Sequence, residues 1–131
     1  MTAETTPLAN FALAAYTAAV RHKSAEVCPA HALWALCRTE EGRRAVEDRS
    51  GDYPAILRVL SERFRAEAQA QPAPPRYGED FQRLIGALGE FSGEGQALDA
   101  GLALDAMIAR CDEFPDLAPA LLQGMLVEEV V

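Results

Sequence analysis

A cysteine and a histidine one helical turn apart could serve as a nucleophile with its activating base, or as metal ligands. Cys28 and His31 lie in the stretch 27–36, Val-Cys-Pro-Ala-His-Ala-Leu-Trp-Ala-Leu. A thiol at a helix N-terminus has a lowered pKa, and a nearby histidine can activate it as a nucleophile. No third group that would orient the histidine can be identified. We therefore favour the interpretation that Cys28 is a small residue at a capping position.

The same pair could also begin a metal site, with His22 and Cys111 as further ligands. Zinc takes about four such ligands, usually in closer sequence pairs. A single Cys-x-x-His is a weak signal, so we expect no metal and no cofactor. A nucleotide motor is not predicted either, because a P-loop needs a Gly-Lys-Ser/Thr run. Lys23 is the only lysine, and no glycine precedes it.

The charge of the chain is negative and unevenly distributed. The net charge is −8, and residues 71–131 hold three Lys/Arg against eleven Asp/Glu, whereas residues 1–70 hold nine of each. Such an acidic surface opposes binding to nucleic acid and to anionic membranes. Partners of basic character are therefore favoured, and we expect neither nucleic acid nor membrane as a partner.

The cysteine count and the N-terminal segment point to the cytoplasm. Three cysteines without regular spacing do not predict a disulfide framework. The first residues lack the basic start and apolar core of a secretion signal. No apolar run approaches the ~20 residues of a membrane span. We expect a single cytoplasmic domain over residues 1–131.

Helix-start signals recur along the chain, and no segment shows the clean alternation of a strand. A polar or small residue in a capping position, proline in the first turn, or acidic residues in the first turn mark each start. These starts are Thr6-Pro7, Cys28-Pro29, Thr39 with Glu40 and Glu41, Asp52 with Pro54, Glu79, Asp99 and 114–116. Residues 70–78 contain three prolines and are predicted to be a linker. The predicted fold class is all-α.

The stretch 27–36 has a degenerate echo at 98–107, Leu-Asp-Ala-Gly-Leu-Ala-Leu-Asp-Ala-Met. In each copy a capping position precedes a helix that is apolar on most sides, which is typical of a buried helix. The helix before each copy has apolar residues at i, i+3, i+4 and i+7: Leu8, Phe11, Ala12, Ala15 and Phe81, Leu84, Ile85, Leu88. The sequence thus predicts a pseudo-duplicated domain of two repeats of about four helices, at about 7–69 and 79–131, joined by the Pro-rich linker.

The doubled order of helices resembles the N-terminal domain of Clp-type AAA+ unfoldases, the Clp N domain, and is closest to its ClpA-like branch. The resemblance covers roughly residues 8–125 and depends mainly on the element from Cys28 to Leu36, a cap-x-x-His-x-Leu-x-Ala-Leu pattern. It implies an all-α pseudo-duplicate that docks adaptors or substrates and has no catalytic activity of its own. It also implies a structural role for His31.

Two departures from the family pattern concern partner binding. Many members have Glu immediately before the motif histidine, where this chain has Ala30, with Gly101 in the second copy. Ala25 also stands where an acidic contact is expected. The partner is therefore expected to differ from phosphoarginine or the ClpS adaptor.

The predicted function is protein recognition in an unfoldase or protease system, either as part of an unfoldase or as a stand-alone accessory protein. We expect an adaptor protein, a protein substrate or an unfoldase component as partner. An apolar groove between the repeats is one candidate surface, and Trp34 is predicted to be core. The partner-binding residues are predicted to be Arg21, Lys23, Glu26, Tyr77, Phe81 and Leu84. The alternatives are a structural helix-binding module of a secretion or assembly apparatus, and a thiol enzyme using Cys28 and His31.

Overall fold

The fold is mostly helical, as predicted. The computed structural model describes residues 5–6, 8–70, 73–92 and 98–126. Its α-helices are α1 (Leu8–Arg21), α2 (Pro29–Cys37), α3 (Glu40–Asp48), α4 (Tyr53–Glu67), α5 (Glu79–Ser92), α6 (Ala100–Ala109) and α7 (Ala118–Leu121). A 3-10 turn (Cys111–Glu113) precedes α7 and a π-helical turn (Leu122–Leu126) follows it. The two-residue strands are β1 (Thr5–Thr6), β2 (Glu26–Val27), β3 (Arg76–Tyr77) and β4 (Leu98–Asp99).

Side-chain caps fix the starts of α3, α4 and α6, where the sequence predicts them. In each case an oxygen of the capping side chain accepts a hydrogen bond from the backbone N–H three residues on, which has no partner within the helix. The pairs are Thr39 with Gly42 (2.9 Å), Asp52 with Ala55 (3.1 Å) and Asp99 with Leu102 (3.2 Å). The predicted start of the first helix includes Pro7, which lies outside the described residues.

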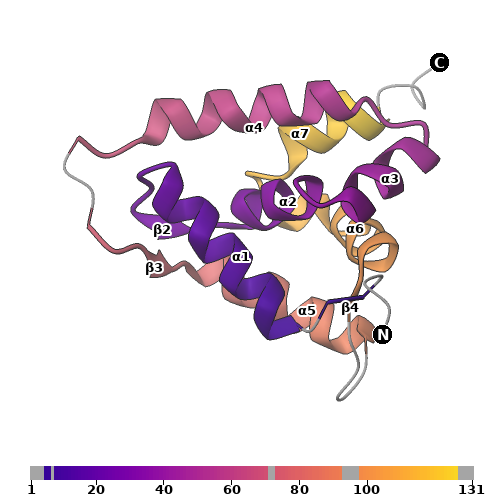
Figure 1. Cartoon of the computed structure of the whole chain (residues 1–131), viewed down its shortest axis with the longest axis horizontal. Coiled ribbons are helices and arrows are strands. Elements are labelled where there is room, and N and C mark those ends of the chain that lie inside the picture. Colours follow the sequence, from indigo (N-terminus) through magenta and orange to yellow (C-terminus); the bar gives the residue numbers. More distant parts are fainter. Residues whose placement is uncertain (1–4, 7, 71–72, 93–97, 127–131) are drawn as a thin grey trace.

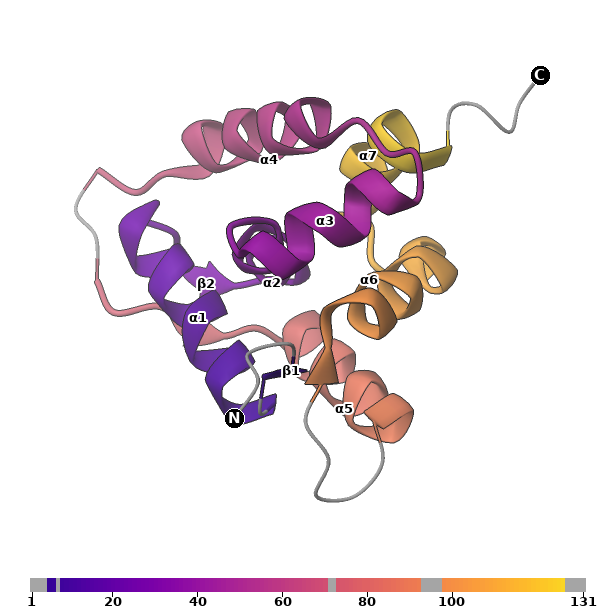
Figure 2. The ribbon, with the colours of Figure 1, turned by 45° about the vertical axis from the view of Figure 1, so that its right-hand side comes forward.

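Helix α2 occupies the centre of the molecule, and the other helices surround it (Figures 1 and 2). It contacts α1, α3, α4, α5 and α6. Eight of its nine residues are buried, so the prediction of a helix apolar on most sides is confirmed. The contact between α1 and α2 includes the small buried residues Ala18 and Ala35, which allow the two backbones to approach closely.

The segment 70–78 is not simply a linker. Its residues Arg76–Tyr77 form β3, which pairs in parallel with β2, so that Glu26 lies opposite Arg76 and Val27 opposite Tyr77. A second ladder joins β1 to β4 in antiparallel register. The pattern of the sequence did not predict these strands, because two residues are too few to show alternation.

The last part of the described chain also differs from the prediction. Residues 114–116 were expected to open the seventh helix, but α7 begins at Ala118 and has four residues before the π-helical turn. Pro119 lies in its first turn, the part of a helix that does not need a proline N–H. Leu117 and Leu121 are buried, whereas Leu122 is half exposed.

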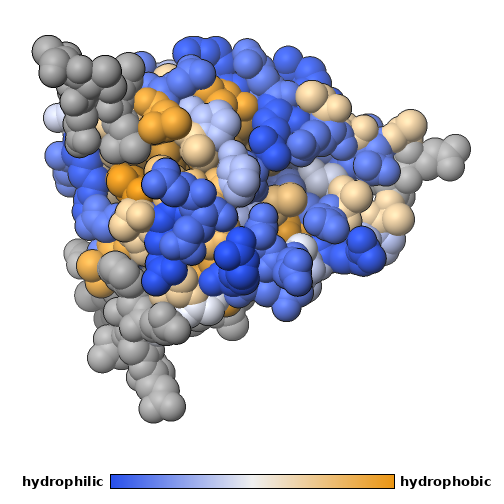
Figure 3. All heavy atoms as spheres, turned by 180° about the vertical axis from the view of Figure 1, so that it is seen from behind, coloured by the Kyte–Doolittle hydropathy of each residue, from blue (hydrophilic) through white to orange (hydrophobic). Residues whose placement is uncertain are grey.

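One core unites all the long helices. Its largest fully buried side chains include Leu33, Ile56, Phe64, Phe81, Leu104 and Phe114. On the face opposite to that of Figure 1, hydrophilic residues predominate and apolar residues form small groups among them (Figure 3). In the described part of the chain, no helix is long and apolar enough to cross a bilayer.

Candidate functional site

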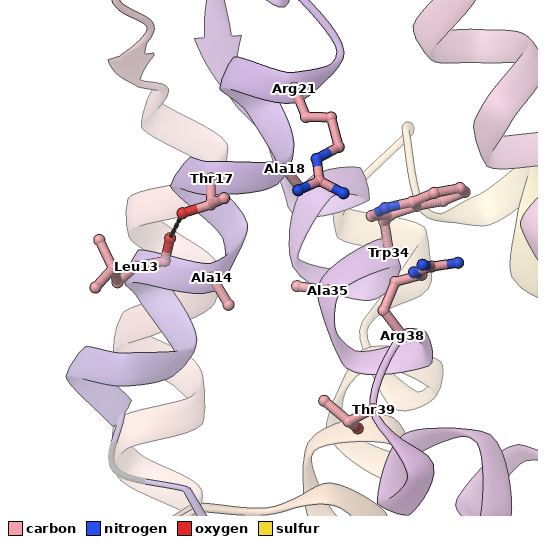
Figure 4. A pocket seen from close by; sticks show the side chains of 9 residues that line it. All are labelled: Leu13, Ala14, Thr17, Ala18, Arg21, Trp34, Ala35, Arg38 and Thr39. Atoms are coloured by element: carbon pink, nitrogen blue, oxygen red, sulfur yellow. Dashed lines mark hydrogen bonds between the residues drawn. The ribbon is translucent and has the colours of Figure 1, made fainter.

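An open groove between α1 and α2 has a mainly apolar lining. It has a volume of about 440 Å³, within the range of about 300–1,000 Å³ that is usual for ligand pockets. The buried Ala18 and Ala35 lie at its base, and Leu13, 60% exposed, stands at one side. Figure 4 shows Ala18 and Ala35 on the facing sides of the two helices.

Two arginines flank the only tryptophan in this groove. Arg21 lies in the last turn of α1 and Arg38 at the C-terminal end of α2. Both guanidinium groups point toward the Trp34 indole in Figure 4, and that of Arg38 lies 5.9 Å from the ring centroid. Trp34 is half-buried rather than fully buried, so its predicted place in the core is only partly right. Its open side belongs to the groove.

The inner face of Trp34 belongs to an aromatic cluster around Phe64 of α4. Phe64 stacks on His31 with centroids 4.6 Å apart and planes at 6°. It also contacts His22 at 4.6 Å and Trp34 at 5.7 Å. The cluster therefore joins α4 to α2 and to the end of α1, and supports the groove from behind.

His31 has two specific hydrogen bonds that give it a structural role. Its Nδ1 accepts a hydrogen bond from the backbone N–H of Cys28 at 2.9 Å, so Nε2 carries the proton and donates to the hydroxyl of Ser24 at 2.9 Å. Desolvation lowers the pKa of His31 to about 4, with smaller contributions from nearby positive groups. A neutral imidazole thus holds together the turn before α2 and the helix itself.

The environment of Cys28 disfavours its thiolate. Burial, with smaller contributions from Asp116 and Glu26, raises the pKa of Cys28 to about 12. Its thiol donates to the carbonyl of Glu26 at 3.7 Å. The expected helix effect on the thiol is outweighed by desolvation and nearby carboxylates. Within the described part of the chain, no three His, Cys, Asp or Glu side chains come together as metal ligands.

The six predicted partner residues divide into an exposed group and a buried group. Arg21, Lys23 and Glu26 are exposed, and Tyr77 is 47% exposed. Phe81 and Leu84, which were also predicted as contacts, are 2% and 0% exposed and lie in the core. Their apolar spacing is typical of the core-facing side of a helix. It contains no further pattern that would indicate a partner-binding surface on α5.

Pairing of β2 with β3 brings Glu26 and Tyr77 onto one side of the molecule. Glu26 forms an exposed salt bridge with Arg76 at 3.3 Å. Tyr77 packs between Tyr16 of α1 at 5.5 Å and Phe81 at 5.7 Å, measured between ring centroids. Arg21 instead lines the α1–α2 groove. The structure therefore does not gather the six residues into one site.

One opening between the two halves is polar, unlike the groove that the sequence predicts there. It has a volume of about 360 Å³, and Phe81 is one of its few apolar side chains. Its charged lining consists of Glu26, Arg63, Glu79, Asp80 and Asp116. The apolar groove lies within the first half of the chain, where the sequence did not place it. Leu13 and Arg38 were missed because neither has a distinctive sequence signal.

Comparisons with protein families, with curated proteins and with solved structures give no match. The resemblance to Clp N domains therefore remains a prediction from the motif at Cys28 to Leu36 and its echo.

Proposed function

We propose that this chain is a non-catalytic docking domain for adaptor or client proteins in a cytoplasmic Clp-type unfoldase or protease system. It acts as part of an unfoldase or as a separate accessory protein. The α1–α2 groove is the observation that carries the proposal, because an open apolar groove with a half-exposed tryptophan suits the binding of a protein segment. The raised pKa of Cys28 argues against the thiol-enzyme alternative.

The burial of α2 and α6 supports the pseudo-duplication that underlies the proposal. Placing Cys28 on Asp99 aligns Ala32 with Ala103, Leu33 with Leu104, Ala35 with Ala106 and Leu36 with Met107, and all eight residues are buried. Other aligned pairs differ in burial, most clearly His31, which is 2% exposed, and Leu102, which is 44% exposed. A two-residue strand also precedes or overlaps each capping position.

A reciprocal contact between the halves supports the same alignment. Ala30 and Gly101 are aligned, and each is contacted by a charged side chain from the other half. The Asp116 carboxylate accepts from the Ala30 N–H at 2.8 Å, and Arg49 donates to the Gly101 carbonyl at 3.3 Å. Arg49 also forms a two-pronged salt bridge with Asp105 of α6, at 2.7 and 3.0 Å.

Chemical-shift mapping with an unfolded client tests the docking role. Isotopically labelled chain is titrated with a reduced, carbamidomethylated protein that cannot refold, and separately with the folded form of that protein. We expect shifts of residues in the α1–α2 groove and of 21–27 with the unfolded form only. Absence of any shift, or shifts confined to residues 40–60, would contradict the proposal. Equal shifts with both forms would instead favour the structural-module alternative, which needs no client preference.

A further inference from the structure

We propose that the α1–α2 groove selects protein segments in which an acidic side chain lies beside a bulky apolar one. The carboxylate is held by Arg21 and Arg38, and the apolar side chain packs against Leu13 and Trp34. This inference rests on the proposed docking function and specifies the chemistry of the docked segment.

The two arginines of the groove lack the ion pairs that most other arginines form in the described part of the chain. Seven of the nine other arginines each reach a carboxylate of this chain within 3.5 Å, and the exceptions are Arg58 and Arg65 of α4. Among the described residues, the guanidinium groups of Arg21 and Arg38 have neither an ion-pair nor a hydrogen-bond partner. Both side chains are exposed and line the same groove from different helices. Their hydrogen-bond donors are therefore available to a ligand.

The groove differs in charge from the rest of the molecule. The whole chain has a net charge of −8, yet none of the described acidic side chains lines this groove. It is therefore a small positive site on an acidic molecule. A carboxylate fits it, because guanidinium and carboxylate groups match in shape and form charge-assisted hydrogen bonds. A nucleic acid does not fit, since the surrounding negative charge would repel its phosphates.

The apolar part of the groove defines the rest of the ligand. Leu13 is exposed to 60%, and the neighbouring Ala14 is exposed as well. Trp34 presents an indole that is held by T-shaped ring contacts with His22 and Phe64, so it is a rigid surface for an aliphatic or aromatic side chain. The groove is open to solvent rather than closed, so a chain can pass along it. We therefore assign the carboxylate to a side chain of an internal segment.

Matched peptides test this selection directly. The probe is the fluorescent peptide Gly-Ser-Glu-Leu-Phe-Glu-Ser-Gly, blocked at both ends so that only its side chains carry charge. Its twin has Gln in place of both Glu. We expect the acidic peptide to bind about tenfold more tightly at low salt, and this preference to shrink as salt is added. Equal binding of the two peptides, or binding of neither, would overturn the inference.

Variants locate the binding. The double variant Arg21→Gln/Arg38→Gln is expected to lose the preference for Glu, whereas the control Arg58→Gln/Arg65→Gln is expected to keep it. Arg58 and Arg65 are exposed arginines of α4 that also lack an ion-pair partner among the described residues, so the control makes the same change in net charge. Equal loss in both double variants would overturn the inference and indicate a general charge effect.

The apolar contact has its own matched pair. Leu13→Ser is expected to weaken binding of both peptides, and Leu122→Ser, at a residue of similar exposure on the π-helical turn, to leave it unchanged.

Because all four side chains are exposed in the arginine variants, circular dichroism should show a retained fold. If unfolded clients shift the groove residues but the peptides show no acid preference, this inference fails while the docking function stands. If neither client nor peptide binds, both fail.

Discussion

The Asp116 carboxylate accepts a hydrogen bond from the backbone N–H of Ala30 at 2.8 Å, across 86 positions of the sequence. Ala30 lies in the first turn of α2, where backbone N–H groups have no partner within the helix and where negative charge is favourable. Cys28 holds the capping position, but its thiol bonds to the Glu26 carbonyl instead. Asp116 therefore supplies the cap of α2 from the other half of the chain.

Removal of this cap should destabilise the fold. Asp116→Ala leaves the buried N–H of Ala30 without an acceptor, so we expect the free energy of unfolding to fall by about 1–3 kcal/mol. Asp116→Asn retains an acceptor and should cost less. Urea unfolding measures both. Asp112→Ala, at an exposed position close by, is the control and should change stability by less than about 0.5 kcal/mol. Equal losses in the two alanine variants would contradict a capping role.

The low pKa of His31 predicts acid sensitivity. Its pKa is lowered from 6.5 to about 4 in the fold, so the unfolded chain binds this proton more readily. The free energy of unfolding therefore keeps its full value at pH values above the unfolded-state pKa of 6.5. It decreases as the pH falls from there through the folded-state pKa of about 4. The change amounts to roughly 3 kcal/mol in the free energy of unfolding. Urea unfolding at a series of pH values measures it.

Two histidine variants test whether His31 is the group responsible for this pH dependence. His31→Gln should remove most of the slope between the two pKa values, although it also lowers stability at neutral pH by removing the contact with Phe64. His22→Gln leaves His31 in place and should retain the slope. A slope that survives in His31→Gln would show that another group is responsible.

The raised pKa of Cys28 predicts an unreactive thiol. Alkylation by iodoacetamide proceeds through the thiolate, so Cys28 should react far more slowly in the folded chain at about pH 8 than in the same chain in urea. Burial also raises the pKa values of Cys37 and Cys111. Mass spectrometry of the labelled peptides distinguishes the three. A reaction midpoint for Cys28 near the ordinary value of about 8.5, or below it, would restore the thiol-enzyme alternative.

Two helical glycines should respond oppositely to alanine. Alanine normally stabilises a helix interior by up to ~1 kcal/mol relative to glycine. Gly86 of α5 has open space where a Cβ would lie, so Gly86→Ala should give this gain. A Cβ at Gly42 of α3 would collide with the backbone carbonyl of Leu36, so Gly42→Ala should destabilise. Thermal unfolding measures both, and a gain at Gly42 would show that the turn between α2 and α3 can relax.

The burial of apolar residues shows what sequence spacing could not decide about the site. The spacing of Phe81 and Leu84 marks one face of α5, but spacing alone does not say whether that face meets solvent, a partner or the core. Packing against the other helices buries both residues. In the same way, the Pro-rich composition predicts an extended segment, but only the neighbouring backbone at Val27 provides the partner that makes Tyr77 part of a strand.

The helical class and most helix starts could be predicted from the sequence, because they depend on local interactions. Thr39, Asp52 and Asp99 each cap a helix through a group three residues away, and any structure containing that turn can satisfy them. The capping of α2 by Asp116 follows only from the tertiary structure, as does the position of Arg21 and Arg38 on either side of one tryptophan. Those contacts join segments far apart in the chain, and their geometry follows from how the helices pack around α2.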